Sequence, residues 1–182
     1  DSVARLAAGH LRVMRRGRGL APMPLTLPED FEGAPAILAL GGELKSAFCL
    51  TARRNALLSH HLGDLDEPAT GEEFEAAHRD YTAIFRHRPA AVAVDLHPNY
   101  RASRHGADIA RDAGLPLFSI AHHHAHITAT LAEAGWRRDA GPVIGIALDG
   151  LGMGADGTLW GAEILLCDYR HMRRLARLSP IP

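Results

Sequence analysis

Residues 35–58 read PAILALGGELKSAFCLTARRNALL, and this stretch decides the fold class. Its three short apolar runs are separated by the glycine pair Gly41-Gly42 and by a polar segment with two arginines. Short apolar runs bounded by turn residues are typical of neighbouring β-strands. The stretch therefore predicts a β-meander that opens an α/β domain, with strands at 36–40, 47–50 and 56–58.

Strand and helix patterns alternate after this meander, which implies parallel pairing with helices covering the sheet. A strand, a glycine-rich turn and a second strand then repeat the opening pattern, so we expect a duplicated lobe whose second copy is cut short at Pro182. Three helices are predicted: one begins near Thr70, a second covers 101–113, and a third runs from the histidine cluster to Gly135. The predicted strands cover 91–94, 115–120, 143–148 and 159–166.

The first 33 residues differ from the rest. Apolar residues near Leu11 and a basic run at 15–19 predict a short strand pair or a single strand with a turn, and a stretch with several prolines follows. Prolines at this density are typical of linkers. We therefore expect a boundary after residue 33, a first lobe over 34–141 and the start of a second lobe over 142–182.

The composition is that of an ordinary globular protein. The 182 residues are 47% hydrophobic, and 20 Lys plus Arg against 21 Asp plus Glu give a net charge of −1. A chain with this balance has no general attraction to nucleic acid or to an anionic membrane. Because the sequence shows no long apolar run, no signal-peptide pattern and no CxxC pair, we expect no membrane span and a cytoplasmic protein.

The sequence AHHHAH at 121–126 carries the strongest chemical signal. His122 and His126 stand four positions apart, which on a helix places both imidazoles on one face within reach of a single ion. Imidazole pairs suit zinc, iron, nickel or copper better than magnesium. Solvated histidines near a helix N-terminus are the alternative. We predict a metal site at His122 and His126 that needs a third ligand from elsewhere, and packing or hydrogen-bonding roles for His123 and His124.

A first glycine-rich stretch could hold a phosphate. Gly41 and Gly42 lead to Lys45, which is the only lysine of the chain. Glycines let an anion approach the backbone closely, and a lysine supplies a mobile positive charge. An ordinary glycine hairpin is the alternative.

A second glycine-rich stretch, 149–157, follows a predicted buried strand. We predict a loop that wraps phosphates, with an aspartate at its start that holds a metal or its water. A long hairpin loop is the alternative, and the stretch matches neither a Walker loop nor GxGxxG opening a helix. Its candidate residues are Asp149, Gly150, Gly152, Gly154 and Gly157.

Two polar segments remain as weaker candidates. Residues 95–100, DLHPNY, follow a predicted strand and offer groups that can hydrogen-bond a ligand. Residues 59–64, SHHLGD, are similarly polar but are equally consistent with a solvated loop.

Five motifs follow one another along the chain: LGGELK at 40–45, LSHHLGDL at 58–65, DLHP at 95–98, HHHAH at 122–126 and DGxGxGxxGxxWGxE at 149–163. Together they resemble the HypF family of carbamoyltransferases, which serves the maturation of nickel–iron hydrogenases. Residues 15–22, RRGRGLAP, are also similar to the end of that family's YrdC-like domain, which would make 1–33 the tail of such a domain and a linker.

The resemblance implies an actin-like ATPase (ribonuclease H-like) fold, with a mixed sheet and helices. It implies an enzyme that makes carbamoyl-adenylate from carbamoyl phosphate and ATP and passes the carbamoyl group to the C-terminal cysteine of a HypE-type partner. By motif, His122 and His126 would bind a divalent metal, iron or zinc, and Lys45 and the 150–157 loop would lie near the nucleotide. The family's third metal ligand, an aspartate, would lie beyond Pro182.

Two rival functions stay open. An O-carbamoyltransferase built from similar domains would use a small-molecule hydroxyl as its acceptor instead of a cysteine. A non-catalytic docking or nucleotide-binding module of the actin-like fold would perform no transfer, and a purely docking module would bind neither ATP nor metal.

Overall fold

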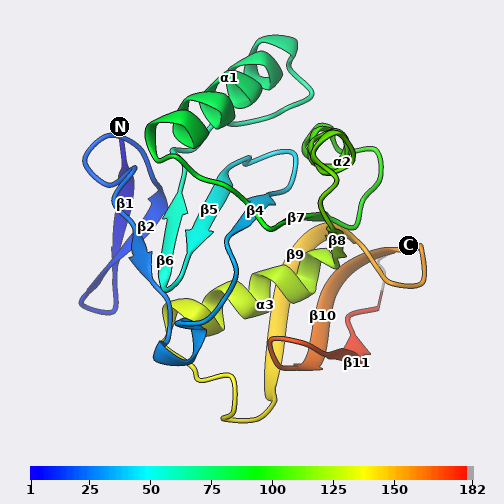
Figure 1. Ribbon diagram of the computed structural model, residues 1–182. Helices are drawn as coiled ribbons and strands as arrows, with labels where there is room; N and C mark the ends of the chain where they lie inside the picture. Colours follow the sequence, from blue (N-terminus) through cyan, green and yellow to red (C-terminus); the bar gives the residue numbers. More distant parts are fainter. Residues whose placement is uncertain (180–182) are drawn as a thin grey trace.

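The computed structural model describes residues 1–179, which form a β-hairpin, a six-stranded sheet and a three-stranded sheet together with three α-helices (Figure 1). The strands are β1 (Val3–Ala7), β2 (His10–Arg15), β3 (Leu25–Thr26), β4 (Ile37–Leu40), β5 (Phe48–Ala52), β6 (Asn55–Leu58), β7 (Ala91–Asp95), β8 (Leu117–Ile120), β9 (Val143–Met153), β10 (Leu159–Cys167) and β11 (Met172–Arg177). The helices are α1 (Pro68–Ile84), α2 (Arg101–Ala113) and α3 (His122–Glu133), with a short 3-10 helix at Glu29–Phe31.

The six-stranded sheet has the order β3-β6-β5-β4-β7-β8. Strands β4, β5 and β6 pair antiparallel, which confirms the predicted meander. Strands β7 and β8 join the other side of β4 in parallel, each reached through a helix, as the alternating pattern predicts. The fold is therefore a mixed α/β fold.

The two faces of this sheet differ in side-chain size. Leu38 and Leu40 of β4 alternate toward the side that carries α1 and α2, where they join Phe74 of α1 in the hydrophobic core. On the opposite face Ala39 pairs with Cys49 of β5 and with Ala93 of β7. Small side chains stand next to one another across three strands, and this leaves space on that face.

Helix α3 connects the two sheets. It follows β8 of the first sheet and packs on β9 of the second, where Ile127 lies so close to Gly145 that a Cβ at that glycine would be 2.7 Å from the Ile127 side chain. The second sheet has the order β11-β10-β9 and is antiparallel throughout. It thus repeats the antiparallel opening of the first sheet.

The glycine-rich stretch after the predicted strand at 143–148 is only partly a loop. Strand β9 continues to Met153, so Asp149 to Met153 belong to a strand, and the turn covers only the residues between Met153 and Leu159. The prediction of a loop from Asp149 was wrong because glycine is rare inside strands and the sequence does not show what packs against it. An irregularity in the pairing of β9 with β10 at Trp160 to Ala162 accompanies the glycines.

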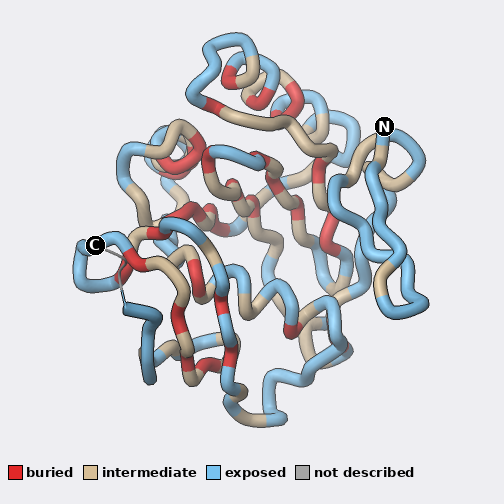
Figure 2. Tube along the Cα trace, turned by 180° about the vertical axis from the view of Figure 1, so that it is seen from behind, coloured by how far each residue is buried: buried red, intermediate tan, exposed pale blue. Residues whose placement is uncertain are grey.

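The N-terminal segment contains the predicted strand pair. Strands β1 and β2 form a separate hairpin, which is largely exposed on both strands (Figure 2). Within residues 1–179, no helix has the length and apolar character that crossing a membrane requires.

Candidate metal centre

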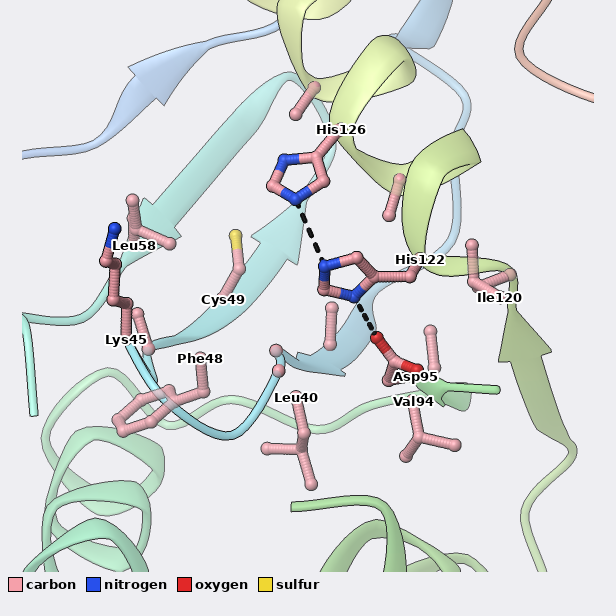
Figure 3. A pocket seen from close by; sticks show the side chains of 17 residues that line it. Leu40, Lys45, Phe48, Cys49, Leu58, Val94, Asp95, Ile120, His122 and His126 are labelled. Carbon is pink, nitrogen blue, oxygen red and sulfur yellow. Dashed lines mark hydrogen bonds and ion pairs between the residues drawn. The ribbon is translucent and has the colours of Figure 1, made fainter. Parts of the chain in front are cut away.

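A cavity of about 440 Å³ lies between the six-stranded sheet and α3. The small side chains on the free face of the sheet leave this space, and two alanines of α3 close it from the other side. Figure 3 shows the two histidines of α3 on one side of the cavity and Lys45 on another. The lining residues are Ala39, Leu40, Gly41, Gly42, Lys45, Ala47, Phe48, Cys49, Leu58, Ala93, Val94, Asp95, Ile120, His122, Ala125, His126 and Ala129.

The structure brings the predicted histidine pair together. Helix α3 begins at His122, directly after the extended Ala121, so that His122 and His126 lie on successive turns at its N-terminus. Nε2 of His126 lies 3.2 Å from Nε2 of His122, and the two rings are nearly perpendicular. The i and i+4 spacing therefore aims both Nε2 atoms at one point, as the sequence predicts.

Asp149 of β9 adds a carboxylate to this pair. Its Oδ2 lies 2.7 Å from Nε2 of His122 and 3.6 Å from Nε2 of His126. The three ligand atoms lie within 4.8 Å of one another. Asp149 thus offers a third ligand atom within residues 1–179. The aspartate that the resemblance implies beyond Pro182 lies outside the described residues.

Asp95 at the end of β7 holds His122 from the other side. Its Oδ2 lies 2.6 Å from Nδ1 of His122, and its Oδ1 accepts the backbone N–H of His97 at 2.8 Å. Asp95 is buried, so this carboxylate has a fixed position. The hydrogen bond to Asp95 raises the pKa of the His122 imidazole, and burial of the ring opposes this shift.

These contacts determine which nitrogen of His122 carries a proton. A carboxylate beside Nδ1 favours the tautomer with the proton on Nδ1, which leaves a lone pair on Nε2. That lone pair faces Oδ2 of Asp149, which is buried and has no partner in hydrogen-bond geometry. Two acceptors at this distance repel each other unless a cation, either a proton or a metal ion, lies between them.

The donor set fits a transition metal. Two imidazole nitrogens and one carboxylate oxygen are ligands that zinc and iron accept, and the carboxylate–histidine contact at Asp95 is the usual outer support for a metal-bound imidazole. His123 and His124 point elsewhere, as predicted. His123 is fully buried next to Trp160, and His124 contacts the backbone carbonyl of Asp168 through its Nε2 at 2.7 Å.

The first glycine pair lies at this centre. A Cβ at Gly41 would be 2.7 Å from the carbonyl oxygen of Ala47, and a Cβ at Gly42 would be 3.5 Å from Cε1 of His122. Gly41 therefore permits a close backbone approach, and Gly42 borders the histidine ring. Lys45 is exposed at the edge of the cavity, so the structure places it near the metal centre but in contact with solvent.

Two glycines of the second glycine-rich stretch make room for neighbouring side chains, whereas the sequence predicts a loop that wraps phosphates. A Cβ at Gly152 would be 2.7 Å from Cε1 of His123 and 2.8 Å from Cβ of His122, and a Cβ at Gly154 would collide with the ring of Trp160. Gly157 has a φ of +76° in the turn, and Gly150 has open space around it. Gly152 thus lets β9 approach α3, which brings Asp149 to the histidines.

Sequence reasoning missed the role of Glu43. This residue is only 7% exposed, and its two carboxylate oxygens lie 3.0 and 2.9 Å from the backbone nitrogen of Arg101, the first residue of α2. Its carboxylate satisfies a free N–H at the positive end of a helix. Glu43 thereby ties the glycine turn to α2, and only its place between the glycine pair and Lys45 could have indicated this.

Family models match most of the chain. One, described as the HypF Kae1-like domain, matches residues 32–133. Another, described as the second subdomain of the Kae1-like domain of carbamoyltransferases, matches residues 145–182.

Several relatives and solved structures are similar over the whole chain. The carbamoyltransferase HypF of Rhodobacter capsulatus is 54% identical over 182 residues, which are 100% of this chain and 24% of that protein. The probable carbamoyltransferase HypF of Methanocaldococcus jannaschii is 30% identical over 98% of this chain and 23% of its own length. A crystal structure of full-length HypF in the phosphate- and nucleotide-bound form has a TM-score of 0.89 and 40% identity, covering 98% of this chain and 23% of that one. The chain thus spans about a quarter of the length of these relatives.

Proposed function

Because this chain belongs to the HypF family of carbamoyltransferases, we propose that it forms the part of such an enzyme in which a carbamoyl group reaches its acceptor. The donor is carbamoyl-adenylate, made from carbamoyl phosphate and ATP. The acceptor is the C-terminal cysteine of a HypE-type maturation protein in the cytoplasm.

One observation carries the proposal. Nε2 of His122, Nε2 of His126 and Oδ2 of Asp149 converge beside a cavity large enough for a small substrate. In the proposed reaction the cysteine thiol releases its proton to solvent, its sulfur forms a bond to the carbamoyl carbon, the bond from that carbon to the phosphate oxygen breaks, and AMP leaves. A divalent metal, iron or zinc, would polarise the carbamoyl oxygen when bound.

The residues of this chain prepare the site. Asp95 fixes the ring of His122 and keeps its proton on Nδ1, so that Nε2 is free as a ligand. Glu43 holds the glycine turn, and Gly42 keeps the space beside His122 open. The alanines of the sheet and of α3 give the cavity largely apolar walls.

We place the nucleotide between the two lobes. The proposed contacts are Gly41, Gly42 and Lys45 from the first lobe and Asp149, Gly150, Gly152, Gly154 and Gly157 from the second. Support comes from the position of Lys45 at the cavity and from a neighbour of 40% identity described as phosphate- and nucleotide-bound. Since Gly150 and Gly152 lie in a strand, the turn with Gly154 and Gly157 is the part of the second stretch best suited to wrap a phosphate.

The proposed domain division follows the same premise. Residues 1–33 form the tail of a YrdC-like domain and a linker, 34–141 form the first lobe of the carbamoyltransferase domain, and 142–182 begin the second lobe. The hairpin of β1 and β2 pairs with neither of the other sheets, which supports a separate origin for this part of the segment. The linker that follows is attached to the first lobe, because β3 within it pairs with β6 at the edge of the six-stranded sheet.

The experiment measures transfer of labelled carbamoyl from carbamoyl phosphate and ATP by the full protein. We expect label on a HypE-type acceptor and none on the same acceptor with its C-terminal cysteine changed to serine. Label on a small alcohol instead would favour the O-carbamoyltransferase, and absence of both transfer and ATP binding would favour the docking module.

A further inference from the structure

Three segments far apart in the sequence meet beside Lys45, which lines the cavity. The backbone N–H of His61, in the loop after β6, donates to the carbonyl of Arg16 at the end of β2 at 2.7 Å. The N–H of Leu62 donates to the carbonyl of Ser46 at 2.9 Å. The hairpin end, the glycine turn and the loop after β6 therefore lie side by side.

This arrangement gathers positive charge. Arg15, Lys45 and His61 each flank one of these backbone contacts, and we name the three residues the cationic rim. None of the ion pairs found in residues 1–179 involves any of the three. Burial lowers the pKa of His61, and the nearby charges of Arg15 and Lys45 lower it further. A carboxylate beside the His61 ring would raise this pKa instead.

One member of the rim lines the cavity of the metal centre. Lys45 lines this cavity together with His122 and His126, and Figure 3 shows it across the cavity from Asp95. Arg15 and His61 are not among the lining residues and belong to the two segments next to that of Lys45. A ligand in the cavity would thus meet the metal centre at one end and Lys45 at the other, with Arg15 and His61 beyond Lys45. Uncompensated cations that converge at a pocket mouth attract and orient anionic ligands.

We propose that Arg15, Lys45 and His61 form an oxyanion subsite that holds the anionic end of a ligand whose other end reaches the metal centre. This inference rests on the proposed function and extends it, because it adds Arg15 and His61 to the residues that bind the substrate. The oxyanion is the phosphate of the carbamoyl donor or the terminal carboxylate of the acceptor. Both have the charge and the compact oxygen donors that arginine and lysine bind.

The first test titrates the full protein, freed of metal by chelation, with inorganic pyrophosphate. Arg15→Gln, Lys45→Gln and His61→Gln should each weaken binding on the order of 10-fold. The matched control is Arg12→Gln, because Arg12 lies on the same strand as Arg15 but pairs with Arg5 away from the rim. Lys45 and Arg15 are exposed, so their substitution removes charge without disturbing the core.

The second test identifies the source of the oxyanion. Carbamoyl transfer is measured on an acceptor peptide that ends in cysteine, either as the free acid or as the amide. If the subsite holds the carboxylate, wild type prefers the acid and the three variants lose this preference. If it holds the phosphate, the variants bind pyrophosphate weakly and keep the KM for both peptides.

The proposal is overturned if neither pyrophosphate binding nor the preference for the acid changes in the three variants. A wild-type protein that transfers no carbamoyl group but loses pyrophosphate binding in the variants would contradict the proposed function and leave the subsite standing. The two inferences can therefore fail separately.

Discussion

Oδ2 of Asp149 on β9 lies 2.7 Å from Nε2 of His122 on α3, so the second sheet completes a site that the helix after the first sheet begins. Neither element holds three ligand atoms alone. The metal centre therefore depends on the packing of α3 against β9 as much as on the histidine spacing.

Replacement of both His122 and His126 by alanine should remove the metal. We expect His122→Ala together with His126→Ala to lower metal affinity on the order of 100-fold or more, because both nitrogen ligands are lost. Metal content after dialysis, measured by elemental analysis, tests this in the full protein. His171→Ala is the control, since this histidine is exposed and far from the ligands in the sequence. Metal retained by the double variant together with normal turnover would refute the site.

Asp95→Asn should weaken the metal site without removing a ligand. An amide keeps an acceptor for the N–H of His97 but can present an N–H to Nδ1 of His122, which favours the wrong tautomer. Loss of such an outer contact typically costs 10- to 100-fold in affinity or activity. Isothermal titration with zinc measures the change, and the exposed Asp139→Asn serves as control. Equal affinity of both variants would show that Asp95 does not orient the ring.

Gly152→Ala should separate α3 from β9. The added Cβ would be 2.7 Å from His123 and 2.8 Å from His122, so the helix must move, at a cost of about 1–3 kcal/mol in the free energy of unfolding. Asp149 then moves away from His122, and the affinity for the metal falls. Gly150→Ala is a matched control on the same strand, because a Cβ there meets nothing within 4 Å. A metal site lost in both variants would point instead to a shared role of these glycines in ligand binding.

The meander and the histidine pair were predictable from the sequence because both are local. Short apolar runs bounded by turn residues identify β4 and β5, and a spacing of four residues on a helix brings His122 and His126 together whatever the rest of the chain does. The parallel pairing of the strands after the meander followed from the alternation of strand and helix patterns.

The remaining parts depend on tertiary contacts. A glycine that supplies a positive φ, as Gly157 does, and a glycine that makes room for a histidine ring, as Gly152 does, look alike in a sequence. The loop prediction for 149–153 was wrong for this reason. The sequence did not predict that Asp149 lies beside the histidine pair, because the meeting of β9 with α3 has no local signal.

The buried imidazole of His78 should make stability fall in mild acid. Burial of the ring and, second to it, the charge of the adjacent His105 together lower the pKa of His78 to about 4. The unfolded chain takes up the proton near pH 6.5, whereas the folded chain resists it, so the unfolded state gains protons first as the pH falls. Between about pH 6.5 and 4 the free energy of unfolding should therefore decrease by up to about 3 kcal/mol, with the full contribution present only above this range. Urea unfolding followed by circular dichroism across this range measures the effect. His78→Gln retains a polar group of similar size that does not titrate. Its free energy of unfolding should therefore fall less with decreasing pH than that of wild type, by this amount. Parallel curves would show that His78 is protonated in the folded protein as readily as in the unfolded chain.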